Sequence, residues 1–212
     1  MDINNKKATR QSYGEALVEI GRENGNIVVF DADLSTATKT NLFAKEFHNR
    51  FFDMGIAEQN MISTAAGMAT CGKIAYASTF AMFAAGRAYD QIRNSVCYPN
   101  LNVKICATHA GITVGEDGAT HQMIEDISLM RTIPNMTVLS TSDDIQTKWA
   151  VKEISKIKGP VYLRLSRLAT PIIYDENQKF KIGKAIQIGD GTDGTIFATG
   201  VTVAEAIKAQ EN

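Results

Sequence analysis

Six short apolar runs recur along the chain, and stretches with helical spacing separate them. The runs predict strands at 26–31, 51–54, 73–78, 101–108, 136–140 and 161–165. Strands this apolar are buried on both faces, which is typical of a parallel sheet covered by helices on its two sides. We therefore expect an α/β fold with a six-stranded, mostly parallel sheet and helices on both faces, followed by the start of a truncated second α/β domain.

Helical spacing fills the intervals between these runs. The pattern predicts helices near 12–21, 40–47, 58–70, 83–96, 123–132 and 143–157. Thr9 can cap the first helix, and Ser142 or Asp143 can cap the last. Polar loops at 32–38, 79–82 and 109–121 each follow a predicted strand. Because the carboxyl ends of parallel strands meet at one edge, these loops should converge there, where such sheets bind ligands.

Composition excludes several classes of function. The 212 residues carry a net charge of -1 with no block of like charges, which removes the electrostatic case for nucleic-acid or anionic-membrane binding. No run approaches the roughly 18 apolar residues of a membrane span, and the first residues lack an apolar leader region. Cys71, Cys97 and Cys106 form no C-x-x-C pair, so we expect free thiols, no metal site and a cytoplasmic protein.

Glu58 stands at the start of a predicted helix made almost entirely of small and apolar residues. One interpretation is a first-turn acid that complements the helix dipole, worth roughly 0.3–1 kcal/mol. The other is a buried acid whose pKa is set by opposing effects of desolvation and the helix N-terminus, a common catalytic device. Position alone leaves both interpretations open.

The loop 109–122 concentrates reactive groups directly after a predicted strand. It contains His109, His121, Glu116, Asp117 and three glycines. Histidine and aspartate can bond hydroxyls and move protons near neutral pH, although loop histidines also serve purely structural roles. The spacing of the two histidines matches no common zinc pattern.

Five further residues are weaker candidates for a binding site, and each also has an ordinary structural interpretation. Phe80 and Phe83 are either core residues or an apolar wall against a flat heteroaromatic ring. Arg87 belongs to a charged helix face. Arg10 and Arg167 lie at loop ends, where an arginine is either solvated or suited to a phosphate.

The pattern of the sequence changes after residue 170. We expect one domain at 1–170, a linker at 171–183 and the incomplete beginning of a second domain at 184–212. Within the last part, 184–188 and 195–198 predict two strands joined by a glycine-rich turn, and a helix begins near Val203. This part is too short to close a core, so either another chain completes it or the sequence is the truncated start of a longer domain.

Four motifs in order resemble the second half of transketolase, and more narrowly the C-terminal subunit of two-gene transketolases. They lie at 55–60, 78–80, 87–91 and 109–122, and the resemblance covers residues 8–212. It implies a thiamine-diphosphate enzyme whose pyrimidine-binding domain is residues 1–170. The acid matching Glu58 is then catalytic, because it bonds a ring nitrogen of the cofactor's aminopyrimidine and promotes the tautomer that activates the thiazolium carbon.

The same resemblance assigns the remaining candidates. Phe80, Phe83, Asp33 and Arg87 fall in the cofactor region. The residues implied to hold the sugar are His109, Asp117 and His121, of which His121 is also catalytic, with Arg10 and Arg167 on its phosphate. The implied reaction transfers a two-carbon ketol unit from a ketose phosphate to an aldose phosphate. The sequence departs from the family at Gly86, where an aromatic is expected, and at Ala37, where a phosphate-binding serine is expected.

This chain has no diphosphate-binding domain, so the resemblance implies an obligate N-terminal transketolase subunit that holds the diphosphate and a Mg or Ca ion. A symmetric heterotetramer and an inactive isolated chain are expected. Two alternatives remain. One is a subunit similar to 1-deoxyxylulose-5-phosphate synthase or another thiamine-dependent transferase, and the other is a non-catalytic interaction module.

Overall fold

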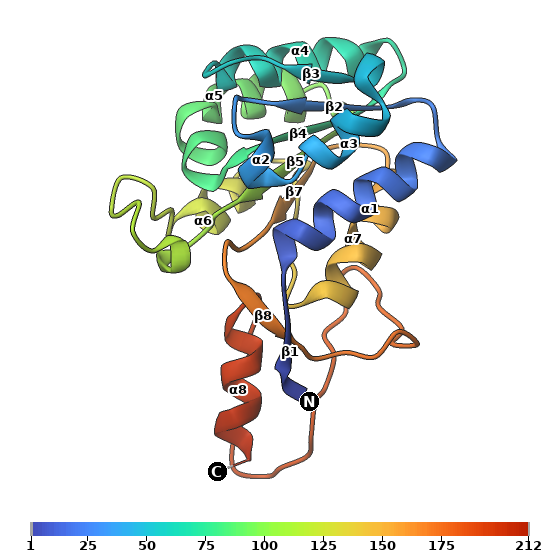
Figure 1. Cartoon of the computed structure of the whole chain (residues 1–212). Coiled ribbons are helices and arrows are strands. Elements are labelled where there is room, and N and C mark those ends of the chain that lie inside the picture. The colour runs from blue at the N-terminus through green and yellow to red at the C-terminus, as the bar shows by residue number, and fades with distance from the viewer. Residues whose placement is uncertain (1, 212) are drawn as a thin grey trace.

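A six-stranded parallel sheet forms the centre of the computed structural model, which describes residues 2–211 (Figure 1). Its strands are β2 (Ile27–Asp31), β3 (Phe51–Asp53), β4 (Ile74–Phe80), β5 (Val103–Thr108), β6 (Thr137–Ser140) and β7 (Val161–Arg164). They lie in the order β3-β2-β4-β5-β7-β6, and each neighbouring pair is parallel. The predicted fold class is confirmed.

Helices cover both faces of this sheet. They are α1 (Thr9–Glu23), α2 (Ser35–Thr38), α3 (Asn41–Glu46), α4 (Glu58–Thr70), α5 (Tyr89–Gln91), α6 (Asp126–Arg131) and α7 (Asp144–Lys156). The last helix, α8 (Thr202–Gln210), lies outside these layers, below the sheet in Figure 1. No helix in this described part of the chain is long and apolar enough to cross a membrane.

Alternation along β2 explains how the two faces are filled. Ile27 and Val29 pack into a core cluster with side chains of α1, α3 and α7, whereas Val28 and Phe30 pack into a second cluster with α4 and the segment after β4. All five residues of β2 are buried. A strand buried on both faces needs apolar side chains along its length, which Ile27 to Phe30 supply, and only the last residue, Asp31, is polar.

A second, two-stranded sheet lies below the main one in Figure 1. In it β1 (Asp2–Ala8) pairs antiparallel with β8 (Ala169–Ile172), and Lys6 lies opposite Pro171. The sequence pattern predicted no strand before residue 26, and β1 is therefore an element that it missed. The pairing uses backbone groups and needs no apolar side chains, so a pattern based on hydrophobicity cannot detect it.

The expected hairpin after the linker does not form. Residues 184–198 contain no strand and are almost entirely exposed, whereas α8 forms as predicted. Two strands joined by a turn are marginally stable in water unless they pack on other elements. Residues 184–198 have no such support, so the two predicted strands were wrong.

The expected helix at 83–96 is broken into three pieces. Met82–Arg87 and Ile92–Cys97 are π-helical, and the short α5 lies between them. The N–H of Ala88 donates to the carbonyl of Phe83, and that of Tyr98 to the carbonyl of Arg93, five residues back in each case. Such widened turns are rare and occur frequently at functional sites.

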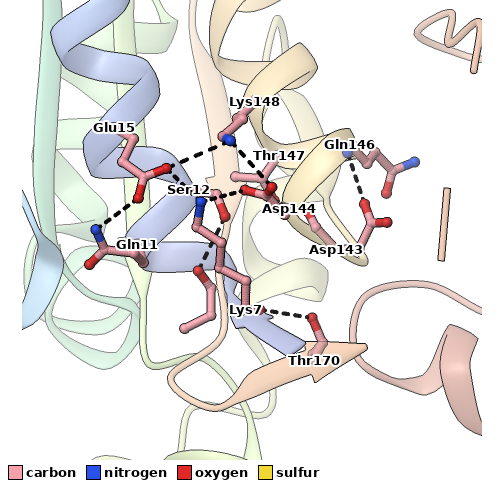
Figure 2. A network of polar contacts seen from close by, with 11 residues as sticks. Lys7, Gln11, Ser12, Glu15, Asp143, Asp144, Gln146, Thr147, Lys148 and Thr170 are labelled. Carbon is pink, nitrogen blue, oxygen red and sulfur yellow. Dashed lines mark hydrogen bonds and ion pairs between the residues drawn. The ribbon is translucent and has the colours of Figure 1, made fainter. Parts of the chain in front are cut away.

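Ion pairs attach β1 to two helices of the main domain (Figure 2). Lys7 Nζ lies 2.6 Å from Glu15 Oε2 on α1 and 3.2 Å from Asp144 Oδ1 on α7. Lys148 Nζ also reaches Asp144, at 3.3 Å from Oδ2. The network fixes the first strand against the helical layer, and with it the paired β8.

Asp143 joins the end of β8 to α7. Its Oδ1 accepts the N–H of Gln146 at 2.8 Å and so caps the helix, as predicted (Figure 2). Its Oδ2 accepts the N–H groups of Ile173 at 2.8 Å and Tyr174 at 2.9 Å. Thr9, the other predicted cap, instead lies inside α1, and its hydroxyl accepts the N–H of Ser166 at 2.9 Å.

We predict that Asp143→Ala lowers the free energy of unfolding by about 2–4 kcal/mol. The substitution removes a helix cap, worth roughly 0.5–2 kcal/mol, and leaves two further N–H groups without their acceptor. Urea denaturation followed by circular dichroism measures the change. Glu176→Ala, an exposed acid in the following turn, is the control and should change stability by less than about 0.5 kcal/mol. Equal stability of the two variants would contradict the role assigned to Asp143.

Candidate active site at the carboxyl edge of the sheet

The carboxyl ends of the parallel strands bring most candidate side chains to one edge. Glu58 follows β3, Phe80 ends β4, His109 follows β5 and Arg167 follows β7. Arg10 reaches the same edge from the first turn of α1. The sequence predicted this convergence from the loops alone, and the parallel topology confirms it.

Glu58 is a buried acid in the first turn of α4. Its residue is 1% exposed, and its Oε2 accepts a hydrogen bond from Nη1 of Arg87 at 2.8 Å. The Arg87 side chain is 45% exposed and comes from the end of the first π-helical segment. The carboxylate therefore lies at the helix N-terminus beside one half-exposed cation. Glu58 is thus both a first-turn acid and a buried one, as the second interpretation requires.

Aromatic rings form a continuous wall at this edge. The ring of Phe80 stacks on His109 with centroids 3.8 Å apart, and on Phe83 at 6.0 Å. His121 meets both phenylalanines edge-on, at 6.3 Å from Phe80 and 5.2 Å from Phe83. The guanidinium of Arg87 lies over the Phe83 ring at 4.5 Å. Glu58 is thereby linked through Arg87 to the wall, and the wall includes both loop histidines.

His109 is held in a strained and buried position. Its backbone is in the left-handed region at φ 56°, and its residue is 3% exposed. Nδ1 lies 2.9 Å from Oγ1 of Thr108. Burial, with the charges of Arg10 and Arg167 nearby, lowers the pKa of His109 to about 3. The imidazole is therefore neutral near pH 7, so its second nitrogen can exchange hydrogen bonds with a ligand without carrying charge.

Two arginines flank His109. Nε of Arg10 donates to the carbonyl of Arg167 at 3.2 Å, and its Nη1 donates to the carbonyl of Ala37 at 2.8 Å. Burial and the charge of Arg167 lower the pKa of Arg10. Arg167 forms a two-pronged ion pair with Glu116, with Nη1 at 2.9 Å from Oε2, and this pair lowers the pKa of Glu116 to about 2. Two like charges held this close suit an anion.

Asp33 and Asp117 stay outside this cluster. Both are exposed, and no hydrogen bond or ion pair among residues 2–211 joins their carboxylates to the aromatic wall. The backbone of Asp33 is left-handed at φ 61°, and its N–H donates to Asp53 Oδ1 at 3.0 Å. Asp117 lies near enough to Arg167 to raise the pKa of that arginine, after the larger effect of Glu116.

The sequence analysis overlooked Asp31, the last residue of β2. It is fully buried, and its carboxylate accepts hydrogen bonds from Thr38 at 2.6 Å, Thr40 at 2.7 Å and the N–H of Leu34 at 2.7 Å. Burial raises the pKa of Asp31 to about 6 despite these bonds. Through these three hydrogen bonds, the carboxylate of Asp31 holds the loop after β2 against the end of the strand. An acid at the end of an apolar run, followed by two threonines, is the signal that could have identified it.

These residues fit part of a site for a flat heteroaromatic group. A buried carboxylate can bond a ring nitrogen, and the rings of Phe80 and Phe83 offer apolar surface to a ring face. In the described part of the chain no group of three or more His, Cys, Asp or Glu residues is placed to hold a metal ion. A hollow of about 620 Å³ lies elsewhere, between residues 173–189 and α8, and contains none of the candidate side chains.

Comparison with known proteins gives one consistent answer. The family described as transketolase, pyrimidine binding domain, matches residues 5–172. A Methanocaldococcus jannaschii protein, provisionally named a transketolase C-terminal section, is 58% identical over 207 residues, which cover 97% of this chain and 66% of that protein. Homo sapiens transketolase is 38% identical over 212 residues, covering 99% of this chain and 34% of the human protein.

A solved structure agrees. A split-gene transketolase, described as an inactive β4 tetramer, is similar with a TM-score of 0.89 and 54% sequence identity, covering 98% of this chain and 67% of that one. The fold and the site at its carboxyl edge thus define a pyrimidine-binding domain. The chain belongs to the transketolase family. It spans about two thirds of the archaeal relative and about one third of the human enzyme.

We predict that His109 stays neutral when folded protein is titrated from pH 8 to pH 4. Desolvation and the neighbouring cations oppose its charged form, and an ordinary histidine titrates near 6.5. Because the unfolded chain takes up this proton first, the fold loses stability as pH falls from about 6.5 towards 3. NMR of the imidazole carbon-bound protons measures the pKa, with exposed His48 as the comparison in the same spectra.

Arg167→Gln provides the matched variant for this titration. Removing one of the cations should move the pKa of His109 upward, while leaving burial in place. A His109 resonance that titrates near 6.5 in the unsubstituted protein would contradict the assignment.

Proposed function

We propose that this chain is the pyrimidine-binding subunit of a thiamine-diphosphate-dependent transketolase. It would transfer a two-carbon ketol unit between a ketose phosphate and an aldose phosphate, in cytoplasmic carbohydrate metabolism. The observation that carries the proposal is the carboxylate of Glu58, 1% exposed at the carboxyl edge and linked through Arg87 to stacked aromatic rings. Membership of the transketolase family supports it.

Each residue on the cofactor side has a defined task. When bound, thiamine diphosphate supplies the carbon nucleophile that the amino acid side chains lack. Glu58 would share a proton with a ring nitrogen of the aminopyrimidine, and Arg87 holds the carboxylate in position. Phe80 and Phe83 would exclude water from the ring face. Asp33 is proposed to act in the same region, from its exposed loop.

The sugar side would use the charged and polar groups around His109. His109 and His121 are proposed to bond the hydroxyl and carbonyl oxygens, with His121 also moving a proton, and Asp117 would bond a hydroxyl. Arg10 and Arg167 would hold the phosphate. This fits the Arg10 guanidinium, which donates to the backbone carbonyl of Arg167, and two charges near enough to His109 to lower its pKa. An incoming phosphate must compete with Glu116 for Arg167.

A partner chain is part of the proposal. We infer that an N-terminal transketolase subunit supplies the diphosphate site and a Mg or Ca ion, and that the two kinds of chain form a symmetric heterotetramer. The similar split-gene structure is described as an inactive β4 tetramer, which supports a chain of this kind being inactive alone. We propose that this chain consists of the pyrimidine-binding domain at 1–170, a linker at 171–183 and the start of a further domain at 184–212.

A subunit similar to 1-deoxyxylulose-5-phosphate synthase is the enzymatic alternative. The two histidines packed edge-on and face-on against Phe80 favour a sugar donor with several hydroxyls over a small keto acid. The buried acid, which a scaffold would not need, argues against a non-catalytic module.

We predict that ketol transfer requires both subunits. The chain alone, with cofactor, Mg²⁺, xylulose 5-phosphate and ribose 5-phosphate, should form no sedoheptulose 7-phosphate, because it offers only the pyrimidine side of the site. Activity should rise as the N-terminal subunit is titrated in and level off at a fixed ratio of the two chains. Product analysis by mass spectrometry measures the transfer.

The same assay separates the alternatives. Pyruvate with glyceraldehyde 3-phosphate should give no product, and a product there would favour the synthase instead. Transfer by the isolated chain, or its absence from the fully reconstituted complex with every donor, would contradict the proposed function.

A further inference from the structure

The loop 109–122 carries both histidines. Backbone contacts among Ala110, Gly111 and Met123 close its base, which we call the neck. Gly111 N–H donates to the carbonyl of Met123 at 2.8 Å, and Ala110 pairs with Met123 as an isolated bridge. On its other side, Ala110 N–H donates to the carbonyl of Leu165 at 3.2 Å, directly after β7. The positions of His109 and His121, at the two ends of the loop, therefore depend on how this neck sits against β7.

Arg164, the last residue of β7, lies against the neck. A Cβ placed on Gly111 would be 3.2 Å from Arg164 Nη2, and Gly111 itself has φ 81°, a conformation that side chains rarely adopt. Arg164 is paired in register with Ala107, two residues before His109. The guanidinium therefore lies close to the loop backbone at Gly111, where a change in its position would act on the loop.

Asp126 holds that guanidinium in place. Its residue is fully buried in the first turn of α6, three residues after Met123, and its Oδ2 accepts Nε of Arg164 at 2.8 Å and the hydroxyl of Tyr162 at 2.9 Å. Burial and this carboxylate raise the pKa of Tyr162 well above its ordinary value, so the phenol stays a donor. Oδ1 of Asp126 has no hydrogen-bond partner within the described structure.

A buried ion pair of this kind is poorly explained as a stabilising device. Taking two charges out of water costs several kcal/mol, and apolar residues of similar size often stabilise a core as well or better. Its specific effect is geometric, because the two partners fix each other's orientation. Here that orientation is transmitted to the neck through Arg164 and to the chain after the neck through Asp126 itself.

We propose that Asp126 and Arg164 are positioning residues that set the distance and angle of His109 and His121 relative to the sugar. This inference rests on the proposed function for its kinetic consequence. Neither residue touches the aromatic wall, so both act through the loop. Tyr162 completes the set by occupying the second site on Oδ2.

The test compares two substitutions in the reconstituted two-subunit enzyme. Asp126→Asn keeps the shape and removes the charge that orients Arg164. Asp144→Asn is the matched control, because Asp144 is also a largely buried acid in the first turn of a helix with a basic partner, but its ion pairs attach β1 (Figure 2). Thermal unfolding of both variants shows how much stability each has lost.

We expect Asp126→Asn to raise the KM for the ketose donor about tenfold or more, with the KM for the cofactor changed less than about twofold, because a small misplacement of a binding group is costly. Asp144→Asn should leave both values near those of the wild type, even where its loss of stability is similar. Tyr162→Phe should give a smaller rise in the donor KM.

An NMR measurement on the isolated chain keeps the test independent of activity. The side-chain resonances of His109 and His121 should shift in Asp126→Asn and not in Asp144→Asn. Histidine signals and donor KM that respond alike in the two variants would overturn the proposal. Shifted signals in a complex with no transferase activity in any form would instead contradict the proposed function and leave the positioning role supported.

Discussion

The site depends on burying the carboxylate of Glu58 at the open edge of a parallel sheet. Removing a carboxylate from water costs several kcal/mol unless other groups compensate. Here the compensation comes from the N-terminus of α4 and from Arg87, whose own side chain remains 45% exposed. Both are placed by the fold, since α4 follows β3 and Arg87 ends the segment after β4. An acid held this way can take a hydrogen bond from a ligand without further rearrangement.

The other side chains at the carboxyl edge of the sheet also have surfaces that groups within this chain cover only in part. Arg10 and Arg167 lie near a neutral histidine, and Phe80 and Phe83 pack beside the two loop histidines. Charged and aromatic side chains of this kind can make further contacts with a ligand or with another protein surface. This arrangement agrees with the proposal that a second chain completes the site.

Side-chain patterns predicted the main sheet and most of the site because both are encoded locally. Apolar runs such as Ile27–Asp31 identify buried strands, and parallel topology then brings their following loops together. What the sequence could not show depends on partners distant along the chain. The pairing of β1 with β8 is made by backbone groups, and the choice of Asp31 over Asp33 as the buried acid depends on how the loop folds back to Thr38 and Thr40. Asp126 belongs to the same group, because its partner Arg164 is 38 residues away.

The central claim is that Glu58 activates the cofactor, and proton exchange at the thiazolium C2 tests it most directly. The reconstituted complex of wild type or Glu58→Gln is mixed with D₂O, quenched in acid after set times, and the remaining C2 proton is measured by NMR. Glu153→Gln, a partly exposed acid on α7 that pairs with Lys156, is the control. The account predicts an exchange rate at least about a hundredfold lower for Glu58→Gln, in line with the usual loss on removing an acid–base group, and an unchanged rate for Glu153→Gln. Equal exchange rates for Glu58→Gln and wild type, with cofactor bound in both, would contradict it.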